Sequence, residues 1–263
     1  YFVERTYAIF TSQDLLHWEL LQKFDLPGDD ECPDLYPLTA DDGRTLWVYS
    51  GAHDMYFVGD FDENGLYQPI QSVGQLSYNS QSYAAQTYYY EPGKPVIRFA
   101  WNRSDIPGAP FNGSMCTPTE MTLKKHGDRY YLSALPIKST ENLVVKSDKL
   151  DDFTLTHCTH ELGSKTCRIS FTVKEGDLTC NLYGLEMKLD KNGLTCGESI
   201  LPRLKNEPMK VDIITDTNSV EIYLNGVANT VIAHVLDETK PTFTIHAEDP
   251  VEVQNLTVSE LSL

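Results

Sequence analysis

The hydrophobic pattern of the chain changes in character once, near residue 140. Before that point, short runs rich in tyrosine and tryptophan alternate with glycine, proline, asparagine and aspartate, which predicts short strands joined by tight turns. No segment repeats its apolar residues at a helical period over three turns, so we predict an all-β fold. The strands predicted in this part are Arg5–Ser12, Thr45–Ser50, Met55–Phe61, Tyr83–Tyr90, Val96–Asn102, Met115–Lys124 and Tyr130–Leu135.

After residue 140 the apolar and polar residues alternate more simply. Cys167–Val173 and Ser219–Leu224 show this alternation, and the second run leads directly into Asn225-Gly226, a pair typical of β-hairpin turns. A period of two predicts antiparallel strands with one face on a core. We therefore expect two domains, residues 1–138 and 139–263, of which the second is an antiparallel β-sandwich.

The composition excludes some classes of partner. The 38 acidic and 21 basic residues give a formal net charge of −17, which disfavours binding to nucleic acid or to an anionic membrane surface. No apolar run approaches the length of about 20 residues that a membrane-spanning helix needs. A neutral partner is compatible with this charge.

The six cysteines include no Cys-x-x-Cys pair, so we expect no structural zinc site. The four cysteines after residue 140 are compatible with disulfides or with buried free thiols. His157-Cys158-Thr159-His160 resembles a metal-ligand cluster, but residues three apart on a strand face opposite sides. We predict neither a metal nor a cofactor.

The segment Glu31-Cys32-Pro33-Asp34-Leu35 holds the most informative chemistry. Pro33 stiffens the backbone and is expected to keep Cys32 extended. A rigid backbone suits a catalytic acid, which must stay within hydrogen-bond reach of its leaving group. The spacing of Glu31 and Asp34, taken alone, is equally compatible with a solvated acidic turn that has no catalytic role.

Three further segments accompany it in a fixed order. They are Ser12–Trp18 (Ser-x-Asp-Leu-x-x-Trp), Tyr56–Asp62 and Tyr83–Thr87. In the first, Ser12 and Asp14 are expected to hold the turn by hydrogen bonds to its backbone, while Leu15 and Trp18 supply packing area. The ordered set resembles glycoside hydrolase family 32, which includes invertases, levanases, inulinases and sucrose-6-phosphate hydrolases. Asp216–Asn225 is similar to a strand of that family's C-terminal sandwich.

The resemblance implies a five-bladed β-propeller with a funnel-shaped active site, followed by a β-sandwich. It implies release of terminal β-linked fructose from sucrose or from inulin- or levan-type fructans, with retained configuration and no metal. Glu31 would be the general acid/base, kept protonated by burial and a nearby carboxylate, with its partner carboxylate about 5–5.5 Å away. Asp34, Tyr83, Gln86 and Trp101 are the expected substrate-binding residues. For two of these residues a purely structural role is an open alternative to substrate binding: Asp34 could stabilise a turn, and Trp101 could pack in the core.

The chain departs from the family in several places. The Asn-Asp-Pro motif of the nucleophile and the Arg-Asp-Pro motif of a second aspartate are absent, so no nucleophile is expected in this chain. We therefore expect a partial propeller that lacks its N-terminal blades and is inactive alone. Ser77 and Thr119 stand where the family carries an aspartate and an arginine, which indicates an altered pocket.

Other functions are compatible with the same residues. The main alternative is a non-catalytic carbohydrate-binding or structural β module, and a five-bladed arabinosidase or xylosidase is a third. The sequence leaves open which fructoside is bound, and whether fructose is passed to water or to another sugar. A secreted or periplasmic location is favoured over a cytoplasmic one.

Overall fold

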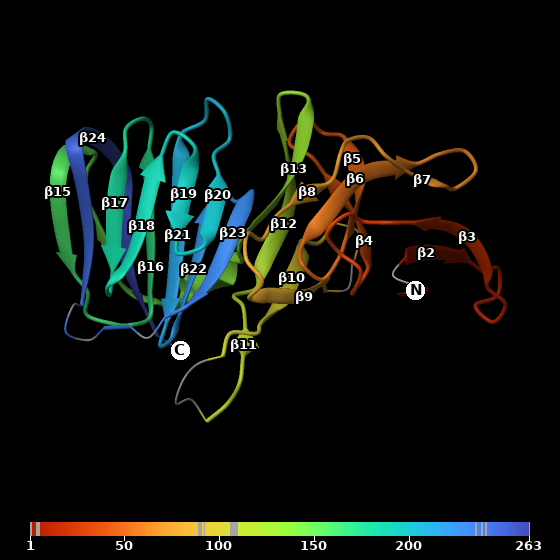
Figure 1. The fold of residues 1–263 in the computed structure, drawn as a ribbon, viewed down its shortest axis with the longest axis horizontal. Coiled ribbons are helices and arrows are strands. Elements are labelled where there is room, and N and C mark those ends of the chain that lie inside the picture. The colour runs from red at the N-terminus through yellow and green to blue at the C-terminus, as the bar shows by residue number, and fades with distance from the viewer. Residues whose placement is uncertain are drawn as a thin grey trace.

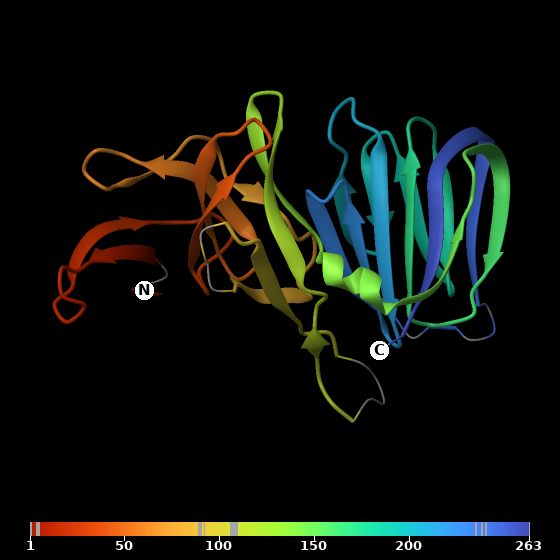
Figure 2. The same cartoon turned by 180° about the vertical axis from the view of Figure 1, so that it is seen from behind.

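The computed structural model describes residues 2–3, 6–88, 91, 93–105, 110–234, 236–237, 239 and 241–262, with the backbone alone at 2–3. Within these ranges nearly all regular structure is strand, and the one helix is the short 3-10 helix η1 (Lys138–Leu143). The prediction of an all-β fold is confirmed. Helix η1 lies between two groups of sheets that sit side by side (Figures 1 and 2).

The first group holds three sheets in the described residues, ordered β1-β2-β3, then β4-β5-β6-β7 with β8 beside β6, then β11-β10-β12-β13 with β9 beside β10. Neighbouring strands in all three sheets pair antiparallel. Their bounds are β1 (Phe2–Val3), β2 (Thr6–Thr11), β3 (Glu19–Phe24), β4 (Asp34–Thr39), β5 (Thr45–Ser50), β6 (Met55–Phe61), β7 (Tyr67–Pro69), β8 (Gly74–Gln75), β9 (Ser82–Thr87), β10 (Val96–Asn102), β11 (Ser114–Met115), β12 (Thr119–His126) and β13 (Arg129–Pro136).

The second group is a single eleven-stranded sheet in the described residues, with the order β20-β19-β18-β17-β24-β16-β21-β22-β23 and with β14 and β15 also paired to β24. Its strands are β14 (Val144–Lys149), β15 (Phe153–Glu161), β16 (Cys167–Val173), β17 (Leu178–Leu182), β18 (Leu185–Asp190), β19 (Gly193–Cys196), β20 (Ser199–Pro202), β21 (Met209–Asp216), β22 (Ser219–Leu224), β23 (Ala228–Ala233) and β24 (Thr242–Leu261).

Strand β24 lets this sheet curl back on itself. The part Thr242–His246 pairs with β15 and β17, whereas Val251–Leu261 pairs with β14, with β16 and with the first residues of β15. The two ends of the strand order then meet, because the hydroxyls of Ser199 in β20 and Thr230 in β23 lie 2.7 Å apart. The nearly closed sheet encloses one large apolar core drawn from most of its strands.

Several strand predictions are confirmed and others need correction. Val96–Asn102 has the predicted bounds, as do Thr45–Ser50, Met55–Phe61, Cys167–Val173 and Ser219–Leu224. Met115–Lys124 is two strands rather than one, because Pro118 has no N–H to donate to a ladder and falls between β11 and β12. β3 and β4 were not predicted. Arg5, Tyr89 and Tyr90, at the ends of two predicted strands, lie outside the described residues.

The two groups of sheets are joined by direct backbone hydrogen bonds. Ala134 N–H donates to the Gly226 carbonyl at 2.8 Å, and Asn229 exchanges 2.8 Å bonds with Leu76 and Tyr78. The Glu221 carboxylate of β22 also accepts the N–H and hydroxyl of Thr117 at 2.8 Å, so β22 takes part in this joint, and its pattern lacks an exposed face although β16 alternates.

The hairpin turn at Asn225-Gly226 forms part of this joint. Both residues adopt positive φ, 53° and 72°, as the sequence pair predicts. A Cβ on Gly226 would lie 2.6 Å from the Ser133 hydroxyl across the joint.

Replacing Gly226 by alanine is expected to lower the free energy of unfolding by about 1–3 kcal/mol, from the positive φ together with the clash. Gly197→Ala is the matched control, because Gly197 also has a positive φ (57°) but nothing within 4 Å of its added Cβ. Urea unfolding of both variants measures the difference. Equal destabilisation of the two would show that the close approach at the joint costs nothing.

Candidate active site

Glu31 lies in the loop that leads into β4, and its side chain is exposed rather than buried in the described structure. Its backbone carbonyl accepts two hydrogen bonds, from the Tyr7 hydroxyl at 2.8 Å and from Ala52 N–H at 2.9 Å. These bonds tie the loop to β2 and to the turn after β5. The loop backbone is therefore fixed even though the carboxylate faces solvent.

The prediction that Pro33 keeps Cys32 extended is wrong. Cys32 has φ of +47°, in the left-handed region that non-glycine residues rarely adopt. The Gln86 side-chain amide donates to the Cys32 carbonyl at 2.9 Å and helps hold this bend. Backbone strain of this kind persists where surrounding contacts over-determine the conformation.

Tyr83, on β9, is the side chain that contacts Glu31 directly. Its hydroxyl donates a hydrogen bond to Glu31 Oε2. That hydrogen bond, with desolvation and the negative charge of Glu31, raises the pKa of Tyr83 to about 12. Tyr83 therefore remains a proton donor toward the carboxylate at neutral pH.

The other sequence-predicted residues surround this pair. Trp101 lies opposite Tyr83 in the β9–β10 ladder, with ring centroids 6.3 Å apart, and is 42% exposed, so a core role does not describe it. Gln86 is exposed and contacts the loop of Glu31 through Cys32. Asp34 accepts the N–H of Leu35 at 2.9 Å and of Thr87 at 2.5 Å, so its contacts join β4 to β9.

The two positions of family departure are both buried. Ser77 is buried at the joint, where it forms an isolated bridge with Asn229 of the second group. Thr119 is fully buried in β12, opposite Arg98 of β10.

Sequence reasoning missed three charged or titratable residues beside Tyr83. The Arg103 guanidinium lies 4.2 Å from the Tyr83 ring centroid, and the His53 ring lies edge-on at 4.8 Å. Asp29, fully buried, holds His53 through both its backbone N–H at 2.6 Å and Nδ1 at 3.2 Å. Nothing in the sequence pairs the acidic Gly28-Asp29-Asp30 run with residue 53.

A buried ion pair supports the strands beneath the site. Asp54 and Arg98 are 3% and 4% exposed, and Arg98 Nε donates to Asp54 Oδ1 at 2.9 Å. Arg98 Nη2 also donates to the Ser82 hydroxyl at 2.8 Å, next to Tyr83. The pair thus links the turn after β5 to β9 and β10.

The Ser12–Trp18 segment confirms one prediction and corrects another. Ser12 Oγ accepts Leu15 N–H at 2.8 Å, and Asp14 Oδ1 accepts the N–H groups of Leu16 and His17 at 2.9 and 2.8 Å, so the polar side chains do hold the turn. The hydrogen bond between the His17 ring and the Asp14 carboxylate, followed by those from the His17 and Leu16 N–H groups, lowers the pKa of Asp14. Leu15 and Trp18 do not supply packing here, because they are 75% and 55% exposed.

The cysteines and histidines form no metal-ligand group within the described ranges. The ring of His157 faces His246 at 6.2 Å, whereas His160 contacts Asp148 at 3.5 Å, so the two histidines diverge. All six cysteines are free thiols, and burial is the main cause that raises the pKa of Cys180 above its ordinary value. No helix in the described part of the chain is long and apolar enough to cross a membrane.

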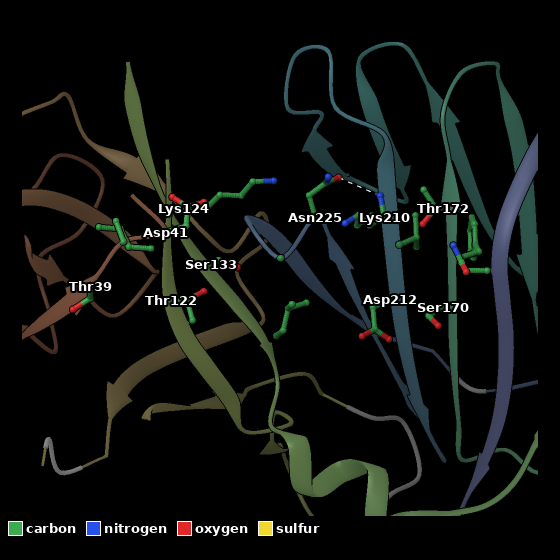
Figure 3. Close-up of a pocket in the computed structure, with 17 residues that line it drawn as sticks. Thr39, Asp41, Thr122, Lys124, Ser133, Ser170, Thr172, Lys210, Asp212 and Asn225 are labelled. Atoms are coloured by element: carbon green, nitrogen blue, oxygen red, sulfur yellow. Dashed lines mark hydrogen bonds between the residues drawn. The ribbon is translucent and has the colours of Figure 1, made fainter. Parts of the chain in front are cut away.

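A cavity of about 650 Å³ lies between the two groups of sheets, away from the Glu31 loop (Figure 3). Glu31 is not among the residues that line it. Two of its charged side chains already have partners in the protein: Asp212 binds Arg168 at 2.9 Å, and Lys124 binds Glu207 at 3.4 Å.

A family model decides which proteins this chain is related to. The model described as the Glycosyl hydrolases family 32 N-terminal domain matches residues 3–134, half of the chain. The chain belongs to glycosyl hydrolase family 32. The resemblance stated from the four ordered segments is confirmed.

Relatives within family 32 match over part of their length. A fructan β-fructosidase of Streptococcus mutans is 28% identical over 162 residues, 51% of this chain and 11% of that protein. A levanbiose-producing levanase of Bacillus subtilis is 26% identical over 204 residues, 69% of this chain and 38% of that protein. The chain thus spans less than two thirds of each relative.

Solved structures share the fold at low sequence identity. The exo-inulinase of Aspergillus awamori superposes with a TM-score of 0.77 at 18% identity, over 98% of this chain and 62% of that chain. The β-fructofuranosidase of Schwanniomyces occidentalis, complexed with fructosyl-erythritol, gives 0.77 at 19% identity, over 99% of this chain and 66% of that chain.

Proposed function

We propose that the protein carrying this chain is a retaining β-fructosidase in which Glu31 is the general acid/base. The observation that carries the proposal is the hydrogen bond from Tyr83 to the Glu31 carboxylate, within a chain that belongs to family 32. The proposed substrates are sucrose and inulin- or levan-type fructans, because related proteins are a fructan β-fructosidase and levanases.

In the proposed reaction Glu31 gives its proton to the glycosidic oxygen as the bond from that oxygen to the anomeric carbon breaks. A partner carboxylate, about 5–5.5 Å away, forms a bond to the anomeric carbon on the opposite side. Glu31, now ionised, then removes a proton from water, and the water oxygen displaces the partner carboxylate. Two inversions leave the configuration of fructose unchanged.

Tyr83 fits the ionised half of this cycle. Its hydroxyl donates a hydrogen bond to the carboxylate oxygen that Glu31 presents after it has given up its proton. Because the pKa of Tyr83 is raised to about 12, this donor does not ionise beside Glu31. Trp101 offers an exposed apolar face to the sugar beside the same pair.

We further propose that residues 1–138 form the later blades of a five-bladed propeller and residues 139–263 a β-sandwich. In this proposal the partner carboxylate belongs to sequence outside the chain, because the Asn-Asp-Pro motif does not occur in it. The 263 residues alone are then inactive, and Glu31 gains its enclosure from the missing blades.

The test is release of fructose from sucrose, inulin and levan, by the isolated chain and by the natural-length protein. We expect turnover only from the natural-length protein, with the β anomer released first in NMR spectra. In that protein Tyr83→Phe is expected to lower kcat about tenfold, since it removes one hydrogen bond to a charged group. Tyr88→Phe is the control, because Tyr88 is 69% exposed. Glu31-dependent turnover by the isolated chain would contradict the proposal that the partner carboxylate lies outside these 263 residues.

The exposure of Glu31 favours one alternative, a non-catalytic carbohydrate-binding β module. That function predicts saturable binding of inulin or levan by the natural-length protein with no release of fructose. Calorimetric titration alongside the hydrolysis assay separates the two functions.

A further inference from the structure

A buried carboxylate orients a partly exposed imidazole beside the proposed acid. The side chain of Asp29 is 0% exposed, whereas that of His53 is 35% exposed. Asp29 accepts hydrogen bonds from Asp30 N–H at 3.1 Å and His53 N–H at 2.6 Å, and its Oδ1 lies 3.2 Å from His53 Nδ1. Burying a carboxylate is costly unless it is hydrogen-bonded, and these three contacts satisfy it.

The contact with Asp29 fixes which ring nitrogen of His53 carries hydrogen. A carboxylate only accepts, so Nδ1 of the neutral ring must be the donor to Oδ1. Nε2, on the far side of the ring, is then an acceptor that points away from Asp29. In the described residues no group binds this Nε2, so it is free to accept a hydrogen bond from a ligand.

The position of the ring places this acceptor at the Glu31 surface. The ring of His53 packs edge-on against Tyr83 at 4.8 Å, and Tyr83 donates directly to Glu31. On another side Tyr83 meets Trp101 at 6.3 Å, so the acid, the aromatic residues and the imidazole form one continuous surface. A sugar that contacts Glu31 there has hydroxyls within reach of this surface.

We propose that His53, oriented by Asp29, is a specificity-determining residue whose Nε2 accepts a hydrogen bond from a hydroxyl of the sugar bound against Glu31. The proposal rests on the β-fructosidase function proposed above and adds a substrate contact to it.

The role of Asp29 in shaping the loops can be separated from the role of the His53 side chain. Asp29 binds the backbone N–H of residue 53, and Ala52 N–H binds the Glu31 carbonyl. Both contacts survive any non-proline substitution at position 53. The imidazole can therefore be altered while the loop that carries Glu31 keeps its anchors.

Substituting His53 by asparagine or by glutamine tests the two ring nitrogens separately. The side-chain amide of asparagine reaches the position of Nδ1, and that of glutamine reaches the position of Nε2. In the natural-length protein with sucrose as substrate, we expect His53→Asn to raise KM about tenfold, the effect of one lost neutral hydrogen bond, with kcat within about twofold. His53→Gln is expected to stay within about threefold of the wild-type KM. His126→Gln, at a partly buried histidine that contacts Glu207, is the control.

Each result of this comparison decides the proposal. A wild-type KM for His53→Asn, or equal losses in the Asn and Gln variants, would overturn the role of Nε2, and melting temperatures verify that both variants fold. Glu31→Gln is measured in parallel. If it is inactive while His53→Asn is normal, the proposed function stands and the assignment of His53 fails. If Glu31→Gln turns over normally, or the wild type releases no fructose, the proposed function fails and this inference with it.

Discussion

Replacing Glu31 by glutamine in the natural-length protein is expected to lower kcat for sucrose by about 10²- to 10⁴-fold, the contribution of a general acid/base. Glutamine keeps the shape of the side chain and can still accept the Tyr83 hydrogen bond, but it has no proton to give to the leaving oxygen. KM should change much less than kcat. Steady-state assays on sucrose measure both constants.

An activated substrate gives this prediction a chemical check. A 4-nitrophenyl β-fructofuranoside has a leaving group that departs without protonation, so its first step should be far less sensitive to Glu31→Gln than the hydrolysis of sucrose. Glu63→Gln, in the exposed turn 62–65, is the control for loss of one negative charge. Equal loss of kcat/KM, which reports the first step, on both substrates would argue that Glu31 supports the fold and does not protonate the leaving group.

Replacing Arg98 by methionine is expected to lower the free energy of unfolding by about 3–5 kcal/mol, because it leaves the Asp54 carboxylate buried without its partner. The Ser82 hydroxyl also loses its donor. Chemical denaturation of the chain measures the loss. It is expected to be the largest stability effect of any single substitution considered.

The double variant Asp54→Asn/Arg98→Met tests the cause. Asparagine removes the unpaired charge and, like aspartate, tolerates the positive φ of position 54 (60°), so part of the lost stability should return. Lys125→Met is the surface control, since Lys125 pairs with Asp42 in an exposed setting, and little change is expected there. A double variant no more stable than Arg98→Met would show that packing, and not charge, sets the loss.

Features that depend only on residues close in the sequence could be predicted from it. The Ser12 and Asp14 hydrogen bonds and the positive φ of Asn225-Gly226 follow from residues within one turn. The exposure of Leu15 and Trp18 was not predictable in the same way, because it depends on what lies over them. For the same reason the burial expected for Glu31 could not be predicted from its neighbours, and its side chain is exposed in this chain.

Pairs that form across sheets left no signal in the sequence. Tyr83 and Gln86 were singled out through a family motif, and both reach the Glu31–Cys32 loop. Asp29 with His53, and Asp54 with Arg98, have no spacing that marks them as partners. At Cys32 a local preference was misleading. Pro33 favours an extended residue before it, but contacts from elsewhere in the fold hold Cys32 at a positive φ.

The long final strand has a consequence for how the chain is made. Since Thr242–Leu261 supplies a ladder partner of β14, β15, β16 and β17, those four strands are synthesised before their common neighbour. On the ribosome they must therefore remain without that neighbour until residue 261 has emerged, with apolar faces open to chaperones. A chain cut just before Thr242 would leave all four strands unable to complete their ladders.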